Sequence, residues 1–284
     1  MKKVLFISLV SIACIFYSCK NEPEIVILTT TSDVLNLNPI NGNQSLSISS
    51  NSVWSAKSSD SWCTLSDSTG TGNKEVVVLC KDNLSGLARE TKITINSGNQ
   101  SKSVVVKQTG GQVLLDENFS NNLMNWNIIN NDSISENINN GFYVIKNSCK
   151  VGAYFVGTKS IISNFTGNYM ITSKYYVVSG TQPFGLTFGY KDNQNFYRIL
   201  IYPWGGYSIT MRLNNVNTSI INGSITFKNE NTISLLKIGK NCDVYINDSK
   251  INSFDLSTPF GSYIGFYSCA QTEINIDNFK VVQF

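Results

Sequence analysis

This sequence of 284 residues contains no histidine. That absence excludes Ser-His-Asp and Cys-His catalytic groups, imidazole-based zinc sites and proton shuttling by histidine. Charged residues are also sparse, at 14% of the chain, and they form no basic block or stripe. A nucleic-acid partner is therefore not expected, because such partners are bound through clustered Lys and Arg. The 19 acidic residues leave chemistry by a pair of carboxylates open.

The apolar stretch at the start of the chain is too short to span a membrane. It runs from Val4 to Phe16, whereas a spanning helix needs about 20 residues. Lys2 and Lys3 precede it, and a small residue precedes Cys19. A charged start, a short apolar core and a small residue before the cut predict a secretory signal over residues 1–18.

The segment around the predicted cut resembles a known modification motif. Phe16-Tyr17-Ser18-Cys19 is similar to the lipobox of bacterial lipoproteins, although its residues are bulkier. The resemblance implies that Cys19 carries acyl chains such as palmitate and that residues 19–24 form an acylated tether. A cut at Cys14 would leave a very short apolar core, and an ordinary secretory signal with an incidental cysteine is the other alternative.

The residues after the cut bear on where the protein is exported. Glu22 and Glu24 follow Lys20, a pattern that resembles the surface-export signal of lipoproteins from the Bacteroidetes group. The resemblance implies a lipid-anchored protein of the outer membrane, exposed at the cell surface. Contact with the membrane is then expected through the lipid anchor only, since several acyl chains together anchor strongly.

Seven cysteines are present. If Cys14 is removed and Cys19 is acylated, five remain, and an odd number leaves at least one thiol unpaired. Cys63 and Cys80 could face each other across a hairpin whose turn lies near residues 68–72. A disulfide and two buried thiols are both open at this point.

After residue 25 the chain shows the pattern of an all-β protein. Short alternating runs of Val, Ile, Thr, Tyr and Phe recur between Gly, Asn, Asp and Ser, and helical periodicity is missing. A composition shift at residues 109–111 predicts two domains, 25–109 and 113–284. The predicted strands of the first domain are 46–50, 53–57, 74–80, 90–96 and 102–108. Those of the second are 142–146, 168–178, 184–190, 196–202, 207–213, 232–238, 242–246, 264–268 and 273–282.

The first domain carries a series of residues in a recognisable order and spacing. They are Trp54, Trp62-Cys63, 70–72, 76–78, Asn83, 89–95 and 104–108. This series resembles the BACON domain, whose name denotes a Bacteroidetes-associated, carbohydrate-binding, often N-terminal module. The resemblance implies an immunoglobulin-like sandwich on glycan-active surface proteins. Because the name suggests the sugar-binding role more than any agreed residues do, no binding site is transferred, and a spacer is an equal alternative.

The second domain carries several short motifs from end to end. They are 116–119 with Trp126, 185–192, 195–198, 244–247, 264–267 and 276–281. Together they resemble the concanavalin A-like lectin and glucanase superfamily, including laminin-G-like and family-16-like modules. The resemblance implies a two-sheet jelly roll, and fold carries over better than activity in so broad a superfamily.

Hydrolysis of a glycan with retention needs two carboxylates about 5–5.5 Å apart on one face. The nearest pattern is the strand from Glu273 to Asp277, where alternation places Glu273, Asn275 and Asp277 on the same face. Asn275 stands where an acid is needed, so an ordinary final strand with its polar face outward is preferred. A glycoside hydrolase stays as an alternative, and no catalytic residue is assigned.

Carboxylates at the two ends of the second domain suggest a structural calcium site, as in lectin-like jelly rolls. Asp116, Glu117 and Asp277 would supply oxygens, and carbonyls would complete the 6–8 ligands that calcium takes. Adjacent terminal strands also carry carboxylates without a metal. No other cofactor is expected.

The best candidate for ligand recognition is the turn between the strands predicted at 196–202 and 207–213. Trp204 at its tip is hard to bury in the domain's own core, with Tyr202 and Tyr207 beside it, and Arg198 and Arg212 on the flanking strands could supply donors. Flat rings stack on the apolar faces of sugars, while polar groups bond the hydroxyls. The structural alternative is that Trp204 folds back over a sheet edge.

These observations favour a surface-anchored lipoprotein that binds a polysaccharide or glycoconjugate without cleaving it. The first domain would be a spacer or an auxiliary binder. The alternatives are a glycoside hydrolase built on the jelly roll, and an adhesin or assembly subunit with a protein partner. Composition cannot separate a glycan ligand from a protein ligand.

Overall fold

The computed structural model describes residues 24–160, 167–256 and 260–284. The predicted signal, Cys19 and all of the predicted tether except Glu24 lie outside this range. Within it, every regular element is a β-strand, and no helix there is long and apolar enough to cross a membrane. The expectation of an all-β chain built from sandwiches is confirmed.

The first sandwich consists of a four-stranded sheet in the order β1-β3-β7-β5 and a five-stranded sheet in the order β2-β9-β8-β4-β6. Strand β2 runs parallel to β9, and the other pairs are antiparallel. The strands are β1 (Leu28–Thr30), β2 (Val34–Leu37), β3 (Asn43–Ser50), β4 (Val53–Ser58), β5 (Cys63–Leu65), β6 (Thr69–Thr71), β7 (Lys74–Cys80), β8 (Arg89–Ser97) and β9 (Gln100–Gln108).

The second sandwich consists of a nine-stranded and a six-stranded sheet. The nine-stranded sheet has the order β11-β12-β13-β24-β15-β20-β21-β22, with β10 also paired to β24, and the six-stranded sheet has the order β14-β23-β16-β17-β18-β19. The strands are β10 (Gln112–Glu117), β11 (Ile129–Asn130), β12 (Ile134–Asn139), β13 (Phe142–Asn147), β14 (Ala153–Ser160), β15 (Tyr169–Ser179), β16 (Phe184–Asp192), β17 (Asn195–Tyr202), β18 (Gly206–Leu213), β19 (Val216–Ser224), β20 (Glu230–Ile238), β21 (Asn241–Ile246), β22 (Ser249–Asp255), β23 (Tyr263–Cys269) and β24 (Thr272–Gln283).

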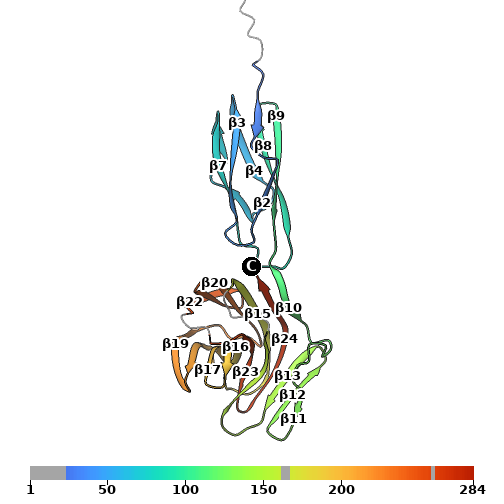
Figure 1. The fold of residues 1–284 in the computed structure, drawn as a ribbon, viewed down its shortest axis with the longest axis vertical. Coiled ribbons are helices and arrows are strands. Elements are labelled where there is room, and N and C mark those ends of the chain that lie inside the picture. The colour runs from blue at the N-terminus through green and yellow to red at the C-terminus, as the bar shows by residue number, and fades with distance from the viewer. Residues whose placement is uncertain (1–23, 161–166, 257–259) are drawn as a thin grey trace, which may run out of the picture.

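Each sandwich has its own hydrophobic core. The buried cluster of the first runs from Leu35 to Val106 along the chain, and that of the second from Leu115 to Val281. Alternation produces both, since every second side chain of a strand points to the same face. Figure 1 shows the two bodies stacked end to end, with the C-terminus returning to the junction between them.

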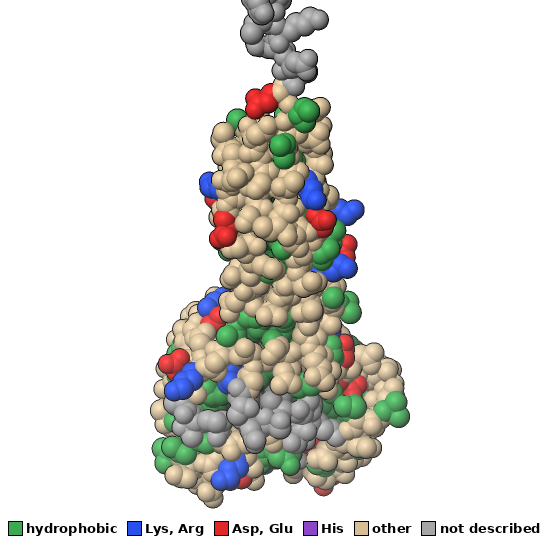
Figure 2. All heavy atoms as spheres, turned by 45° about the horizontal axis from the view of Figure 1, so that its top comes forward, with side chains coloured by type: hydrophobic (Ala, Val, Ile, Leu, Met, Phe, Trp, Pro, Cys, Tyr) green, Lys and Arg blue, Asp and Glu red, His purple; other side chains and the backbone are tan. Residues whose placement is uncertain are grey.

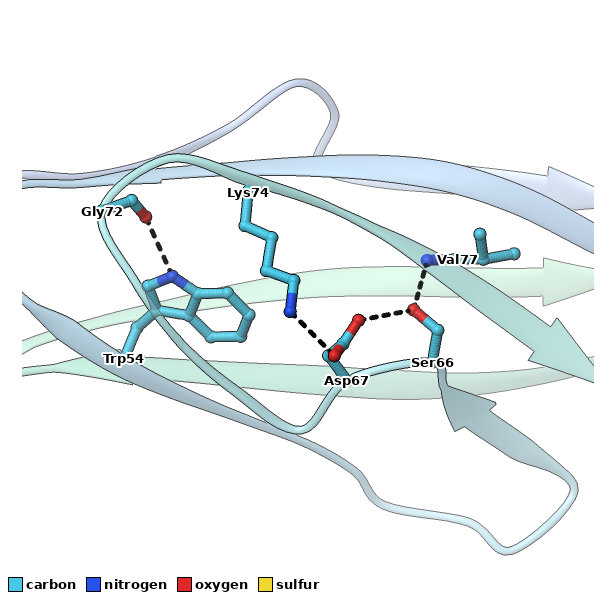
Figure 3. A network of polar contacts seen from close by, with 6 residues as sticks. All are labelled: Trp54, Ser66, Asp67, Gly72, Lys74 and Val77. Atoms are coloured by element: carbon cyan, nitrogen blue, oxygen red, sulfur yellow. Dashed lines mark hydrogen bonds and ion pairs between the residues drawn. The ribbon is translucent and has the colours of Figure 1, made fainter.

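Trp54 anchors the first core and also fixes a loop (Figure 3). Its indole Nε1 donates to the Gly72 carbonyl at 3.0 Å, and its ring lies against Gly70, where a Cβ would come within 2.3 Å of it. In the same region Lys74 pairs with Asp67 at 2.8 Å. The hydrogen bond from Lys74, followed by that from Ser66, lowers the pKa of the Asp67 carboxyl. Because its indole is bonded to Gly72 and packed against Gly70, Trp54 has a structural role.

Arg89 and Gln108 organise the end of the first sandwich that faces the second. The Arg89 guanidinium lies 4.3 Å from the centre of the Trp62 ring and donates from Nε to Gln108 at 2.9 Å. The Gln108 amide donates in turn to the carbonyls of Asn38 and Pro39. These residues of the BACON-like pattern hold loops together at this end of the sandwich.

The junction between the sandwiches is close-packed. A Cβ on Gly110 would lie 2.6 Å from the backbone of Leu87, and one on Gly111 would meet Val282 at 2.4 Å. The Gly111 amide donates to the Ser85 carbonyl at 3.1 Å. A hollow of about 420 Å³ opens beside this point, with residues of both sandwiches in its lining. Larger residues in the linker would force the two bodies apart.

Candidate functional site

The six-stranded sheet of the second sandwich has one face against the core and a second face, called the outer face here, turned away from it. On β17 the side chains of Tyr197, Ile199 and Ile201 are buried in the core. The residues between them point the opposite way, because side chains alternate along a strand. Arg198 and Tyr202, both predicted from the sequence, therefore lie on the outer face.

Arg198 is the centre of a polar cluster on the outer face. Its Nε donates to Thr210 Oγ1 at 3.0 Å, and an Nη donates to Asn217 Oδ1 at 3.2 Å. Its guanidinium carbon lies 4.7 Å from the centre of the Tyr267 ring and 5.3 Å from that of Phe196. Three strands and two rings thus hold the side chain, which is only 7% exposed.

Polar side chains continue from Arg198 to the free edge of the sheet. In the pairing of β18 with β19, Ser208 lies opposite Asn222, Thr210 opposite Ser219, and Arg212 opposite Asn217. Opposing residues of antiparallel strands share a face, and these three β19 residues are exposed. The outer face therefore ends in a solvent-exposed row of hydroxyl and amide groups.

Trp204 stands at the end of this row. Its ring is 73% exposed, lies 5.2 Å from the Tyr202 ring between centres, and covers Gly206, where a Cβ would come within 2.1 Å of it. Gly205 adopts a φ of +99° and closes the turn by donating to the Tyr202 carbonyl at 2.9 Å. The ring folds back over its own hairpin and still presents a face to solvent.

Arg212 lies at the opposite end of the outer face. An Nη donates to Asn215 Oδ1, and the guanidinium carbon is 5.9 Å from the centre of the Phe196 ring. Its Nε is buried with no hydrogen-bond partner among the described residues. Four of the five predicted recognition residues are therefore on one face: Arg198, Tyr202, Trp204 and Arg212.

Tyr207 requires a correction, because it lies on the opposite face of the sheet. Its ring belongs to the core and is 6% exposed, and it lies against Gly223. Its hydroxyl accepts a bond from Asn252 Nδ2 at 3.5 Å. The reason is the strand period: Gly206 is outward in β18, so the next residue points inward.

A hollow of about 470 Å³ lies beside the Trp204 turn, between the end of β19 and the hairpin of β21 and β22. The turn is tied to it, because the Ile225 amide donates to the Gly205 carbonyl at 2.8 Å and Ile225 lines the hollow together with Lys228 and Asn247.

The structure does not bring together the three carboxylates predicted to hold calcium. Asp116 pairs with Lys280 at 3.1 Å, whereas Glu117 accepts from the Phe119 amide at 2.8 Å and from Trp126 Nε1 at 3.1 Å. Asp277 accepts from the Asn278 amide at 2.6 Å. Among the described residues, no group of three or more His, Cys, Asp or Glu is placed to hold a metal ion.

The strand from Glu273 to Asp277 is the final strand β24. Ile274 and Ile276 are in the core, and Glu273 pairs with Lys146 on the neighbouring strand at 3.1 Å. The polar face points away from the core, as the alternation predicted.

Sequence reasoning missed Thr210, Asn217 and Tyr267 as parts of the site. Each is outward on a different strand, and only the strand order places them around Arg198. The available signal was local: once Arg198 is assigned to the outer face of a hairpin, Thr210 follows as its cross-strand partner.

Comparison with known proteins supports the first domain most directly. The family described as "BACON: Putative binding domain, N-terminal" matches residues 52–109, which confirms the resemblance over that range. No curated protein matches the chain.

Solved structures match at low identity. A protein of unknown function with a galectin-like fold from Bacillus subtilis is 11% identical over 61% of this chain and 96% of that one, with a TM-score of 0.46. The carbohydrate binding module CBM66 from Bacillus subtilis is 14% identical over 54% and 88%, with a TM-score of 0.33. A GH5 xyloglucanase from Bacteroides ovatus is 22% identical over 30% of this chain, with a TM-score of 0.28. This chain spans 19% of that enzyme.

Proposed function

We propose that this chain binds a polysaccharide or glycoconjugate on the outer face of the six-stranded sheet, without cleaving it. The observation that carries the proposal is the Trp204 ring, which is 73% exposed and yet held in place over Gly206. A fixed aromatic ring with one face open to solvent is a surface on which the apolar face of a sugar can stack. The row of hydroxyl and amide groups next to the ring supplies what a sugar requires beside a stacking surface.

The arrangement fits a sugar better than a flat protein surface. A sugar ring has an apolar face for Trp204 and hydroxyls for Ser219 and Asn222, which are exposed on the edge strand β19. Rigid presentation lowers the entropy lost on binding, because the turn and the two strands already fix the ring and the polar groups. We further propose that the second sandwich is a concanavalin A-like binding module and that the first sandwich serves as a spacer.

Affinity for a panel of plant, host and microbial polysaccharides tests the proposal. We expect retention of the full chain in an affinity gel containing one of them, and a loss of about tenfold or more in Trp204→Ala, since a stacked ring contributes on the order of 1.4 kcal/mol. Leu123→Ala is the matched control, because Leu123 is 82% exposed on the same sandwich. Equal retention of both variants, or retention by none of the panel, would contradict the proposal.

Attachment to the outer membrane through acylated Cys19 is the cellular part of the proposal. The sequence around Cys19 supports it. Metabolic labelling with an alkyne fatty acid should mark the native chain and not Cys19→Ala. Equal labelling of the two, or labelling of neither, would remove the anchor from the account.

A further inference from the structure

The outer face carries two positive charges, the guanidinium groups of Arg198 and Arg212. The other outward positions on β17, β18, β19 and β23 are aromatic, apolar, hydroxyl, thiol, amide or glycine. The carboxylate at the end of β16, Asp192, accepts hydrogen bonds from the Gln194 amide and from Asn195 Nδ2. Seven lysines elsewhere in the chain pair with Asp or Glu within 3.7 Å. Neither arginine of the outer face has such a partner among the described residues.

The buried charge of Arg198 has neutral partners among the described residues. Residues 153–166 and 257–259 contain no Asp or Glu. Arg198 is only 7% exposed, and a buried charge is costly unless it is paired. The contacts of this guanidinium are all to neutral groups, so an anion bound on the outer face would supply the opposite charge that it lacks.

We propose that the ligand of the outer face is an acidic glycan, carrying carboxylate or sulfate groups. This inference rests on the proposed function and names the substrate class of the same site. A guanidinium presents its donors in a planar fork that matches a carboxylate or sulfate, and bonds to an ionised acceptor are about twice as strong as neutral ones. Arg212 has an Nε with no hydrogen-bond partner among the described residues, and it is the more exposed of the two.

Two matched pairs of polymers test the ligand class on the full chain. Polygalacturonate is compared with its methyl-esterified form, and dextran sulfate with dextran, so that each pair differs in charge and shares a backbone. We expect about tenfold or greater preference for the charged member of at least one pair, and the pair that shows it identifies carboxylate or sulfate. Arg212→Gln should remove most of the preference.

Lys57→Gln is the control for unspecific attraction. Lys57 is an exposed cation on the first sandwich, so losing it changes the net charge equally and should leave the preference intact. Equal affinity for charged and neutral members, with binding still dependent on Trp204, overturns the acidic ligand and leaves the proposed function standing. Equal loss in Lys57→Gln and Arg212→Gln also overturns it. Failure to bind any glycan contradicts the proposed function itself.

A second inference concerns Cys63 and Cys80 and is independent of the ligand. The two residues lie directly opposite each other on β5 and β7. The Lys81 amide donates to the Trp62 carbonyl at 2.8 Å, and the Ser66 amide donates to the Val77 carbonyl at 2.9 Å. Hydrogen-bonded pairs alternate along an antiparallel ladder, so Cys63 and Cys80 form a non-hydrogen-bonded pair.

Such a pair has the geometry that a disulfide needs. Opposing Cα atoms are about 4.5 Å apart in a non-hydrogen-bonded pair, and bridged cysteines have Cα separations of about 4.4–6.8 Å. Both thiols are reduced in this structure. Burial, followed by the neighbouring Cys63, raises the pKa of the Cys80 thiol to about 12. The thiolate form of Cys80 is therefore scarce.

The geometry points to a cross-strand disulfide between Cys63 and Cys80 when the chain meets a disulfide donor. One thiolate attacks a sulfur of the donor and releases its first thiol. The second cysteine then attacks the mixed disulfide and releases the other thiol. In sum two protein thiols lose two protons and two electrons, and the donor is reduced to two thiols.

Peptide mapping without reductant tests the pairing after incubation with oxidised glutathione. The expected product is a linked peptide pair containing Cys63 and Cys80, which disappears on reduction and is absent from Cys80→Ser. Cys149→Ser, at a cysteine in the other sandwich, should leave the linked pair intact. Full alkylation of Cys63 and Cys80 in the denatured, oxidised protein, or linkage of either one to another cysteine, would overturn the assignment.

Discussion

At the scale of single residues, Gly206 decides how Trp204 is presented. The indole lies where a side chain of residue 206 would be, so the absence of a side chain gives the ring its resting place on the outer face. Because side chains alternate along β18, the following residue, Tyr207, points into the core. Glycine here serves close approach, since the φ of Gly206 is not in the left-handed region.

Gly206→Ala should weaken glycan binding without unfolding the chain. The new methyl group displaces the Trp204 ring, which can swing away, so stability should change by no more than about 0.5 kcal/mol. Affinity should fall several-fold. Gly223→Ala is the contrasting variant: its methyl group meets the core ring of Tyr207 and should cost about 1–3 kcal/mol of stability. The opposite pattern, measured by denaturant titration and affinity gel, would argue against the placement of Trp204.

At the scale of elements, the sequence predicted strands that have one buried and one exposed face. β7, β8, β13, β15 and β24 alternate strongly, so their positions followed from periodicity. β19 did not follow, because it is exposed along most of its length and shows no apolar face. The core residues of the second sandwich were thus more predictable than the edge strand that completes the candidate site.

The residue types at three turns could have predicted three of the hairpins. The residue pairs at 140–141, 214–215 and 247–248 all have positive φ angles, which is the requirement of the type I′ turn that joins two strands tightly. Asn-Gly, Asn-Asn and Asn-Asp pairs are suited to it. Reading these pairs as hairpins places β12, β19 and β22, whereas the long-range pairing of β24 with β10, β13 and β15 needs the whole fold.

Asn214→Val should destabilise the hairpin of β18 and β19. Asn214 has a φ of +48°, and a β-branched residue in that region costs about 1–3 kcal/mol. Asn214→Gly should be close to neutral, since glycine adopts this conformation readily. Denaturant midpoints of the two variants measure the difference. Equal midpoints would show that this turn is not needed to hold β19 in place.

At the scale of the whole molecule, two separate cores are joined through a tightly packed glycine linker. The face drawn in Figure 2 is mostly uncharged side chain and backbone, with positive and negative side chains intermixed and no large patch of either sign. Such a surface gives little long-range steering of a partner. Specificity is therefore expected from the local site on the second sandwich.

Removing the first core should leave the site intact. Trp54→Ala deletes a fully buried indole and should cost the first sandwich about 3–5 kcal/mol. Hydrogen exchange is expected to rise in residues 24–109 and to stay low in the second sandwich, with glycan affinity unchanged. Loss of affinity in this variant would show that the first sandwich contributes to binding.

Hydroxyl-radical footprinting of the full chain, with and without the polysaccharide it retains most strongly, tests the central claim most directly. Oxidation of Trp204 should fall by more than half when ligand is present, because a stacked sugar covers the exposed face of the ring. Oxidation of Leu123 on the same sandwich should stay constant. Unchanged oxidation of Trp204 together with protection elsewhere would contradict recognition on the outer face of the six-stranded sheet.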